Sequence, residues 1–422
     1  MKIQKLLNIV LLLAFLTSFL GGGSFNVTAQ TPEPPTTDGT DVSQIRLTQA
    51  DRDAAADRAA ADGFVLEAQG TADMAMPGSA PRYFSHPNYA NSPLPVNSVV
   101  VWNAISQEIL QPTPMPGMPM TMTGASMSTA FVYLAYIQGA VYNALVSIEG
   151  GYAAYNSALP AASTTASRDA AVAAASYQML LNFLTRFPNP DTQAMLTSKY
   201  NALRAEIDDT PANITAGVTV GNAAAAEMIA LRTNDGLLDD IGYVVPTPGP
   251  GVWEPTVLPD GTVVPPVDPW MSLLKPFLRD TASQYRAAPP PALNDPAYLA
   301  DLAEVRDWGG AVSANRTTEQ TEVAQFWTTN MVIQTNAAYR QVAESRRLGL
   351  LDTARLMAMG NMVATDSLIY TFDTKYFYEF WRPTTAIRHT NPDGSYSATE
   401  LNTWMPAVMV PSFPEYVAGH GS

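Results

Sequence analysis

The feature that most constrains the fold is residues 126–152, a run of 27 residues that carries one charge, Glu149. A run of this length can form a single long helix, and it also reaches the length that spans a bilayer. Two polar side chains in its middle, Gln138 and Asn143, many small residues and the lack of basic flanks favour a buried core helix instead. A helix that is apolar on all sides must be surrounded by other elements.

The chain after residue 96 is helical in pattern and gives almost no sign of strands. Period-two alternation is missing, and clusters of Val, Ile and Thr are few. Alanine-rich stretches such as residues 170–175 permit helices to pack closely. The sequence therefore predicts an all-α fold of one or two helical bundles. The predicted helices are residues 96–111, 126–152, 168–186, 190–208, 215–235, 295–309, 313–327, 329–346 and 351–380.

Prolines gather in two predicted loops, residues 112–123 and residues 243–269. A loop as long as the second is uncommon in a compact domain and is often functional. The alternative is a structural wrap that covers one end of the bundle, and the sequence leaves both open.

The N-terminal part of the chain is predicted to lie outside the helical domain. Residues 1–29 have two lysines, an apolar stretch and then small residues, which is the pattern of a secretory signal peptide. A signal anchor is the alternative. Residues 30–95 are predicted to form a proline- and alanine-rich tether with many turns, and residues 96–422 the helical domain. The signal peptide predicts a secreted or periplasmic protein.

Composition excludes some classes of protein. The chain has no cysteine, so an exported form depends on its core rather than on disulfides. The formal net charge is −15, which argues against a general binder of nucleic acids or of anionic membranes. Against this acidic background, a small group of basic residues near the C-terminal end stands out.

That basic group lies in residues 375–388. Lys375 and Arg382 are seven residues apart, about two turns, so on one helix they would leave it on nearly the same side. Aromatic residues around them supply enough apolar surface to bury this helix. Buried charges need partners, so we expect an anion at this position. The alternatives are that Lys375 pairs with Asp373 or Glu379 and that Arg382 caps helix carbonyls.

A second group of polar residues follows about thirty residues later, at residues 413–420. A glycine beside a histidine, Gly419-His420, can present a backbone N–H to a ligand while the imidazole does proton chemistry. The alternative for His420 is a terminal residue without a fixed place.

Together these two groups resemble a known pair of motifs. Lys375-x6-Arg382-Pro and Pro414-x-Tyr-x-x-Gly-His are similar to the first two signature motifs of the vanadium-dependent haloperoxidase and type 2 phosphatidic acid phosphatase superfamily. Segments 251–256, 304–306 and 315–327 resemble its soluble bacterial haloperoxidase-like branch. The family's third motif, an Arg followed by Gly-x-His, does not occur in the printed sequence. The resemblance thus implies a helical bundle of the haloperoxidase type, truncated at its C-terminus, and we expect truncation to leave apolar faces of the 351–380 helix uncovered.

The resemblance also implies roles for particular residues. Lys375, Arg382 and Gly419 would bind the equatorial oxygens of vanadate, with phosphate as a competitor, and His420 would be the catalytic acid–base group. Phe372 and Phe413 match positions on the halide side of the pocket. No residue is assigned as a metal ligand, because the vanadium-ligating histidine of the family belongs to the third motif. The family's second motif has Ser where this chain has Ala418, so one hydroxyl hydrogen bond to the anion is lost.

Three functions stay open at this point. The resemblance implies an enzyme that oxidises halide with hydrogen peroxide at a vanadate site. The second possibility is an acid phosphatase-like hydrolase of phosphoesters, and the third is a non-catalytic helical protein that binds phosphate or vanadate weakly. The expected partners are small molecules, with no nucleic acid, no membrane after signal removal, and a homo-oligomer as one possible assembly.

Overall fold

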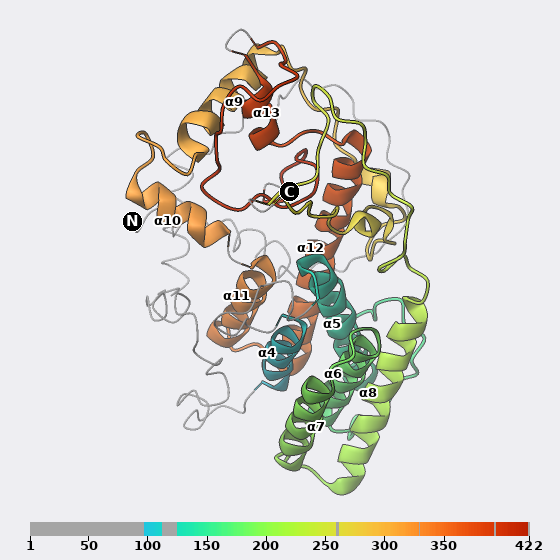
Figure 1. Cartoon of the computed structure of the whole chain (residues 1–422). Helices are drawn as coiled ribbons and strands as arrows, with labels where there is room; N and C mark the ends of the chain where they lie inside the picture. The colour runs from blue at the N-terminus through green and yellow to red at the C-terminus, as the bar shows by residue number, and fades with distance from the viewer. Residues whose placement is uncertain (1–96, 112–124, 259–260, 329, 392–393, 421–422) are drawn as a thin grey trace, which may run out of the picture. The chain divides into compact units, whose positions relative to one another are not determined.

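The computed structural model describes residues 97–111, 125–258, 261–328, 330–391 and 394–420. In this part of the chain there are ten α-helices, isolated β-bridges and no strands, which confirms the all-α prediction (Figure 1). The helices are α4 (Ser98–Leu110), α5 (Met127–Glu149), α6 (Arg168–Arg186), α7 (Pro190–Ala205), α8 (Pro211–Leu231), α9 (Pro296–Gly309), α10 (Thr318–Trp327), α11 (Met331–Ser345), α12 (Leu350–Tyr378) and α13 (Pro383–His389).

Most helix boundaries follow the sequence prediction, and the exceptions have local causes. The helix predicted at 215–235 is α8 and begins four residues earlier, because the Thr210 side chain accepts from the Asn213 N–H and Pro211 occupies the first turn. The helix predicted from residue 313 is α10, and it begins only after a capping box of Thr317 and Gln320. The predicted signal peptide, tether and 112–123 loop lie outside the described residues.

The nearly uncharged segment 126–152 forms α5, and α5 is the centre of the bundle. It packs against α12, α6 and α8, which surround it in Figure 1. Among the described helices, α5 and α8 have the length and hydropathy of a membrane span, with 94% and 28% of those segments buried. The high burial of α5 is what a core helix requires.

Small residues let α6 and α8 approach each other closely. A Cβ added at Gly217 would lie 2.1 Å from the carbonyl oxygen of Ser167, and one at Gly221 would lie 2.3 Å from that of Ala171. Only glycine fits at these two positions. The prediction of close packing along the alanine-rich face of residues 170–175 is confirmed, since that face lies against α8.

The described residues of the proline-rich segment 243–269 form no α-helix, and the end of this segment leads into the short 3₁₀ helix η4 (Pro269–Leu273). A second 3₁₀ helix, η5 (Ala282–Tyr285), follows, and both contact α12. The segment therefore packs beside the end of α12, where the basic residues of the sequence lie.

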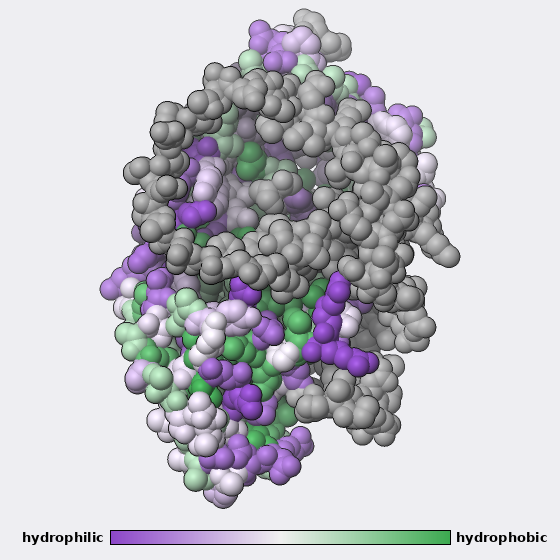
Figure 2. All heavy atoms as spheres, turned by 180° about the vertical axis from the view of Figure 1, so that it is seen from behind, coloured by the Kyte–Doolittle hydropathy of each residue, from purple (hydrophilic) through white to green (hydrophobic). Residues whose placement is uncertain are grey.

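The prediction that α12 would show an uncovered apolar face is wrong. Between Leu350 and Tyr378 the only exposed residues are Asp352 and Phe377. Exposed apolar side chains lie elsewhere, notably on α9 and α10, and none of the α10 residues is buried. In the lower half of the opposite view (Figure 2), the described residues show hydrophilic and hydrophobic side chains intermixed.

Candidate functional site

The two predicted cations meet across a break between helices and not along one helix. Lys375 is in the last turn of α12, which ends where Glu379 takes a left-handed conformation with φ of 48°. Arg382 is the N-cap of α13, and Pro383 occupies its first turn. The prediction of a single helical stripe is therefore wrong, because one helix ends between the two residues and another begins with Pro383 in its first turn.

The break is held by a segment about 130 residues earlier in the chain. The Trp253 N–H donates to the carbonyl of Glu379 at 2.7 Å, and the Trp381 N–H donates to the carbonyl of Gly251 at 3.0 Å. These bonds flank an isolated bridge between Val252 and Phe380. The proline-rich loop thus fixes the direction in which the chain leaves α12.

Both cations lie over the ring of Phe413. The Lys375 Nζ is 5.0 Å from its centroid, and the Arg382 guanidinium carbon is 4.6 Å from it. Phe372 packs beside the same ring, with the two centroids 5.4 Å apart. The structure thus brings together four of the six predicted site residues, and cation–π contact with Phe413 favours the charged groups here.

Lys375 is buried, with 1% of its surface exposed. Its Nζ donates to two backbone carbonyls, those of Pro414 at 2.9 Å and Glu415 at 2.6 Å. Burial lowers its pKa to about 7; the nearby Arg382 also lowers this pKa, while the Glu415 carboxylate raises it. The amine is therefore poised to gain or lose a proton near neutral pH.

Arg382 uses two of its three nitrogens. Its Nε donates to the carbonyl of Phe413 at 2.7 Å, and its Nη1 donates to the Glu415 carboxylate at 2.8 Å. The Nη2 atom is buried and has no hydrogen-bond partner in the described part of the chain. Burial lowers the pKa of Arg382, but a guanidinium remains charged at any ordinary pH. A buried donor without a partner is costly and points to a missing acceptor.

The alternative partners considered for Lys375 bind elsewhere. Asp373 forms a two-pronged ion pair with Arg286, at 2.7 Å for each bond. The Glu379 carboxylate accepts from the Tyr243 hydroxyl at 2.8 Å. The carboxylate that pairs with Arg382 is that of Glu415, an unspecified position of the second motif to which the sequence assigns no role.

The other two predicted site residues extend the same loop. A Cβ added at Gly419 would lie 4.0 Å from Thr371 Cγ2, one turn before Lys375 on α12. The His420 ring is exposed, and its Nε2 lies 2.8 Å from the carbonyl oxygen of Trp327. Gly419 therefore lies beside the helix that carries the lysine, whereas His420 reaches the end of α10.

Comparison with known proteins finds relatives that are similar to this part of the chain. The sequence model described as "VCPO second helical-bundle domain" matches residues 355–422, which contain both cations and the loop beneath them. The vanadium chloroperoxidase of Curvularia inaequalis is 25% identical over 394 residues, covering 77% of this chain. The chain is thus similar to proteins of the vanadium haloperoxidase superfamily. The match spans 63% of the length of that curated relative.

Solved haloperoxidase structures share the fold. A bacterial vanadium-dependent iodoperoxidase has a TM-score of 0.58 and 20% identity, covering 78% of this chain and 79% of its own. A holo-type bacterial vanadium-dependent chloroperoxidase has a TM-score of 0.55 and 19% identity, covering 70% and 72%. These matches confirm that the helical bundle is of the haloperoxidase type.

The residues of this haloperoxidase-like protein fit the oxygens of a tetrahedral anion. The Glu415 carboxylate pairs with Arg382, and the Arg382 Nη2, which has no partner within the described residues, is a donor of the kind that binds an oxyanion in pairs. Within the described residues, no group of three or more His, Asp and Glu is arranged to hold a metal ion.

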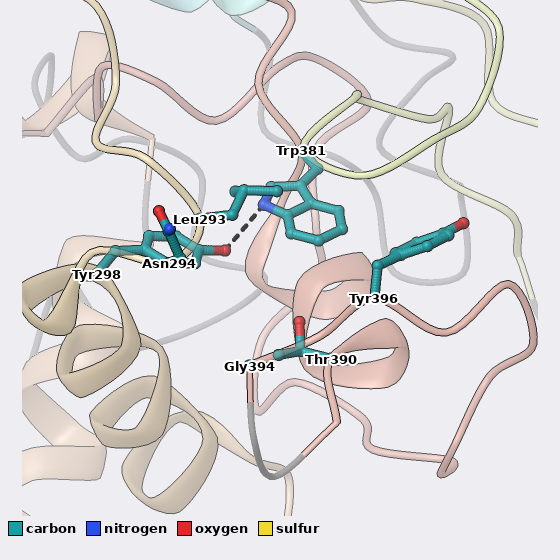
Figure 3. A pocket seen from close by; sticks show the side chains of 7 residues that line it. All are labelled: Leu293, Asn294, Tyr298, Trp381, Thr390, Gly394 and Tyr396. Carbon is teal, nitrogen blue, oxygen red and sulfur yellow. Dashed lines mark hydrogen bonds between the residues drawn. The ribbon is translucent and has the colours of Figure 1, made fainter.

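A separate cavity of about 230 Å³ lies on the other side of the helix break (Figure 3). The Trp381 indole N–H donates to the Tyr298 hydroxyl across it at 2.9 Å. Neither Lys375 nor Arg382 lines this cavity, so it is distinct from the cationic pair. Its lining residues are Leu293, Asn294, Tyr298, Trp381, Thr390, Gly394 and Tyr396.

Proposed function

We propose that the Lys375–Arg382 pair binds vanadate and that this haloperoxidase-like protein oxidises halide with hydrogen peroxide. The observation that carries the proposal is the buried, unpartnered Nη2 of Arg382 beside a second buried cation. A buried site of this kind is costly without an anion, because the protein offers one carboxylate against two positive charges. Similarity to vanadium haloperoxidases supports vanadate as that anion.

Each side chain of this site would have a role that follows from its chemistry. Bound vanadate would supply the activation of peroxide toward halide. Arg382 would grip two oxygens with its planar fork, and Lys375 would place a point charge on a third, in a desolvated site where such contacts are strong. Phe372 and Phe413 would exclude water from the same side. His420 takes no part in these contacts, because its ring lies on the carbonyl of Trp327 at the end of α10.

One departure weakens the proposed site. Ala418 has no hydroxyl where the resemblance expects one, so an oxygen of the anion loses a hydrogen bond, at a cost of about 1–3 kcal/mol. We therefore expect vanadate to bind, but about ten- to a hundredfold more weakly than it would with Ser at this position.

Titration calorimetry with orthovanadate and with phosphate tests the binding site. The wild-type protein is expected to bind one anion, and Arg382→Ala to bind none, because the substitution removes the only two-pronged donor. Arg388→Ala is the matched control, since Arg388 donates to Trp404 and Glu400 and not to the pair. Equal affinities for wild type and Arg382→Ala would contradict the proposal.

A turnover assay tests the reaction. Halide oxidation is expected to require both vanadate and hydrogen peroxide. Hydrolysis of a phosphoester that needs no peroxide and is inhibited by vanadate would instead assign the same anion site to a phosphatase. Export of the protein, and thus access to external halide, is part of the proposal and is read from the location of the mature chain.

A further inference from the structure

We infer that the Glu415 side chain is a built-in competitor that occupies part of the oxyanion site and leaves when the anion binds. This inference rests on the proposed anion site and describes how that site is regulated. It follows from the way the three guanidinium nitrogens of Arg382 are used.

One edge of the guanidinium is fixed by the backbone. The Arg382 Nε donates to the carbonyl of Phe413 at 2.7 Å, so this nitrogen is not available to a ligand. An oxyanion that binds an arginine through two parallel hydrogen bonds therefore has to use Nη1 and Nη2. The Nη2 is vacant, and Glu415 holds Nη1 at 2.8 Å. The carboxylate thus occupies one of the two guanidinium nitrogens, Nη1 and Nη2, that an oxyanion would use.

The Glu415 side chain can leave without moving its backbone. The Glu415 N–H donates to the carbonyl of Phe380 at 2.9 Å, and its own carbonyl accepts from the Lys375 Nζ at 2.6 Å. These two bonds tie the residue to both sides of the helix break. Rotation about side-chain bonds alone is enough to release Arg382.

Burial shows the direction of that release. The Glu415 side chain is 30% exposed, whereas that of Arg382 is 12% exposed. The carboxylate is therefore in contact with solvent to a greater extent than the guanidinium with which it pairs. A released carboxylate regains water, which offsets part of the lost ion pair.

Charge makes exchange more favourable than simultaneous binding. A carboxylate and an oxyanion on the same guanidinium would repel each other at short range in a desolvated site. After exchange, the anion satisfies Nη2 as well as Nη1. Lys375 keeps its carbonyl partners, so the second cation stays in place beside the incoming anion.

The test is phosphate binding by titration calorimetry to Glu415→Gln in the full chain. The glutamine keeps the size of the side chain and removes the competing charge, so phosphate is expected to bind at least tenfold more tightly than to the wild type. Glu400→Gln is the matched control, because Glu400 pairs with Arg388 at the surface and not with Arg382. Glu415→Ala, which removes the whole competing group, is expected to bind phosphate at least as tightly as Glu415→Gln.

The outcomes separate this inference from the proposed function. In one outcome, the wild type binds phosphate, Arg382→Ala does not, and both Glu415 variants bind no more tightly than the wild type. This result overturns the role of Glu415 as a competitor and supports the anion site. Absence of binding in wild type and in both Glu415 variants, each with a wild-type melting curve, overturns the anion site and the competitor together.

Discussion

Two buried arginines meet carboxylates in this protein, and their surroundings differ. Arg232, at the end of α8, lies over the Phe277 ring with its guanidinium carbon 4.1 Å from the centroid. Its Nε is 2.8 Å from the Asp235 carboxylate, and the side chains are 4% and 2% exposed. Arg382 lies over the Phe413 ring at 4.6 Å, but its partner Glu415 is 30% exposed.

The first cluster is balanced in charge, although the buried Arg232 Nε, 2.8 Å from the Asp235 carboxylate, forms no hydrogen bond within the described residues. The terminal nitrogens of Arg232 donate to the carbonyls of Lys275 and Pro276. The Asp235 carboxylate also accepts from the Tyr136 hydroxyl and the Leu237 N–H. One cation meets one anion, and together they fix the chain after α8 against the segment that precedes η5.

The second cluster has a surplus of positive charge. The Glu415 carboxylate pairs with Arg382, whereas Lys375 donates to two backbone carbonyls. A balanced cluster serves the fold, whereas a surplus of desolvated cation is a cost to the fold that a ligand can remove. This difference separates a structural ion pair from a candidate binding site.

The largest expected effect breaks the balanced cluster. Asp235→Asn leaves Arg232 buried without a carboxylate, so we expect the free energy of unfolding to fall by about 3–5 kcal/mol. Chemical denaturation with and without phosphate measures this loss, and phosphate is not expected to restore it. Glu415→Gln is the comparison, with an expected loss below about 1 kcal/mol that phosphate reverses. A larger loss for Glu415→Gln than for Asp235→Asn would reverse the assignment of the two clusters.

A smaller effect comes from the pH dependence of Lys375. Its pKa of about 7 in the folded protein lies below its ordinary value of 10.5, so the unfolded chain holds the proton to higher pH. The free energy of unfolding is therefore highest above pH 10.5, where the lysine is neutral in both states. It falls as pH decreases toward 7, because the unfolded chain binds the proton first. Between pH 7 and pH 9 the wild type should gain about 2 kcal/mol relative to Lys375→Met.

Denaturation curves at several pH values provide that comparison. Lys199→Met is the control, because Lys199 pairs with Glu108 and contacts no part of the candidate site. Parallel pH profiles for wild type and Lys375→Met would show that the lysine is not desolvated as the structure describes.

The smallest effect concerns the ring beneath the cations. Phe413→Leu keeps an apolar side chain but removes both cation–π contacts, so we expect phosphate affinity to fall several-fold, about 1 kcal/mol. Phe372→Leu is the control, since that ring packs against Phe413. Calorimetry compares the two variants, and an equal loss for both would assign the effect to packing alone.

Much of the helical bundle could be predicted from the sequence. The apolar pattern and uncharged length of residues 126–152 identify α5, and the alanine-rich face of residues 170–175 indicates close packing with a neighbour. These signals are local, because a helix is set by spacing and caps within a few residues. The start of α8 was missed by four residues because the cap at Thr210 outweighed the apolar pattern.

The candidate site was predictable in its residues but not in its geometry. The end of α12 at Glu379 has no glycine or asparagine to mark it, and it is fixed by contacts with residues 251–253 far away in the chain. Glu415 joins Arg382 across 33 residues. Spacing along the chain cannot show such pairs, so a helical stripe was predicted where a helix break exists.

Crystal structures of the protein with and without vanadate test the central claim most directly. We predict that, with vanadate, the anion lies on Nη1 and Nη2 of Arg382 while the Glu415 carboxylate points to solvent, and that without it the carboxylate returns to Nη1. A structure in which vanadate binds elsewhere, with Glu415 still on Arg382, would contradict the account.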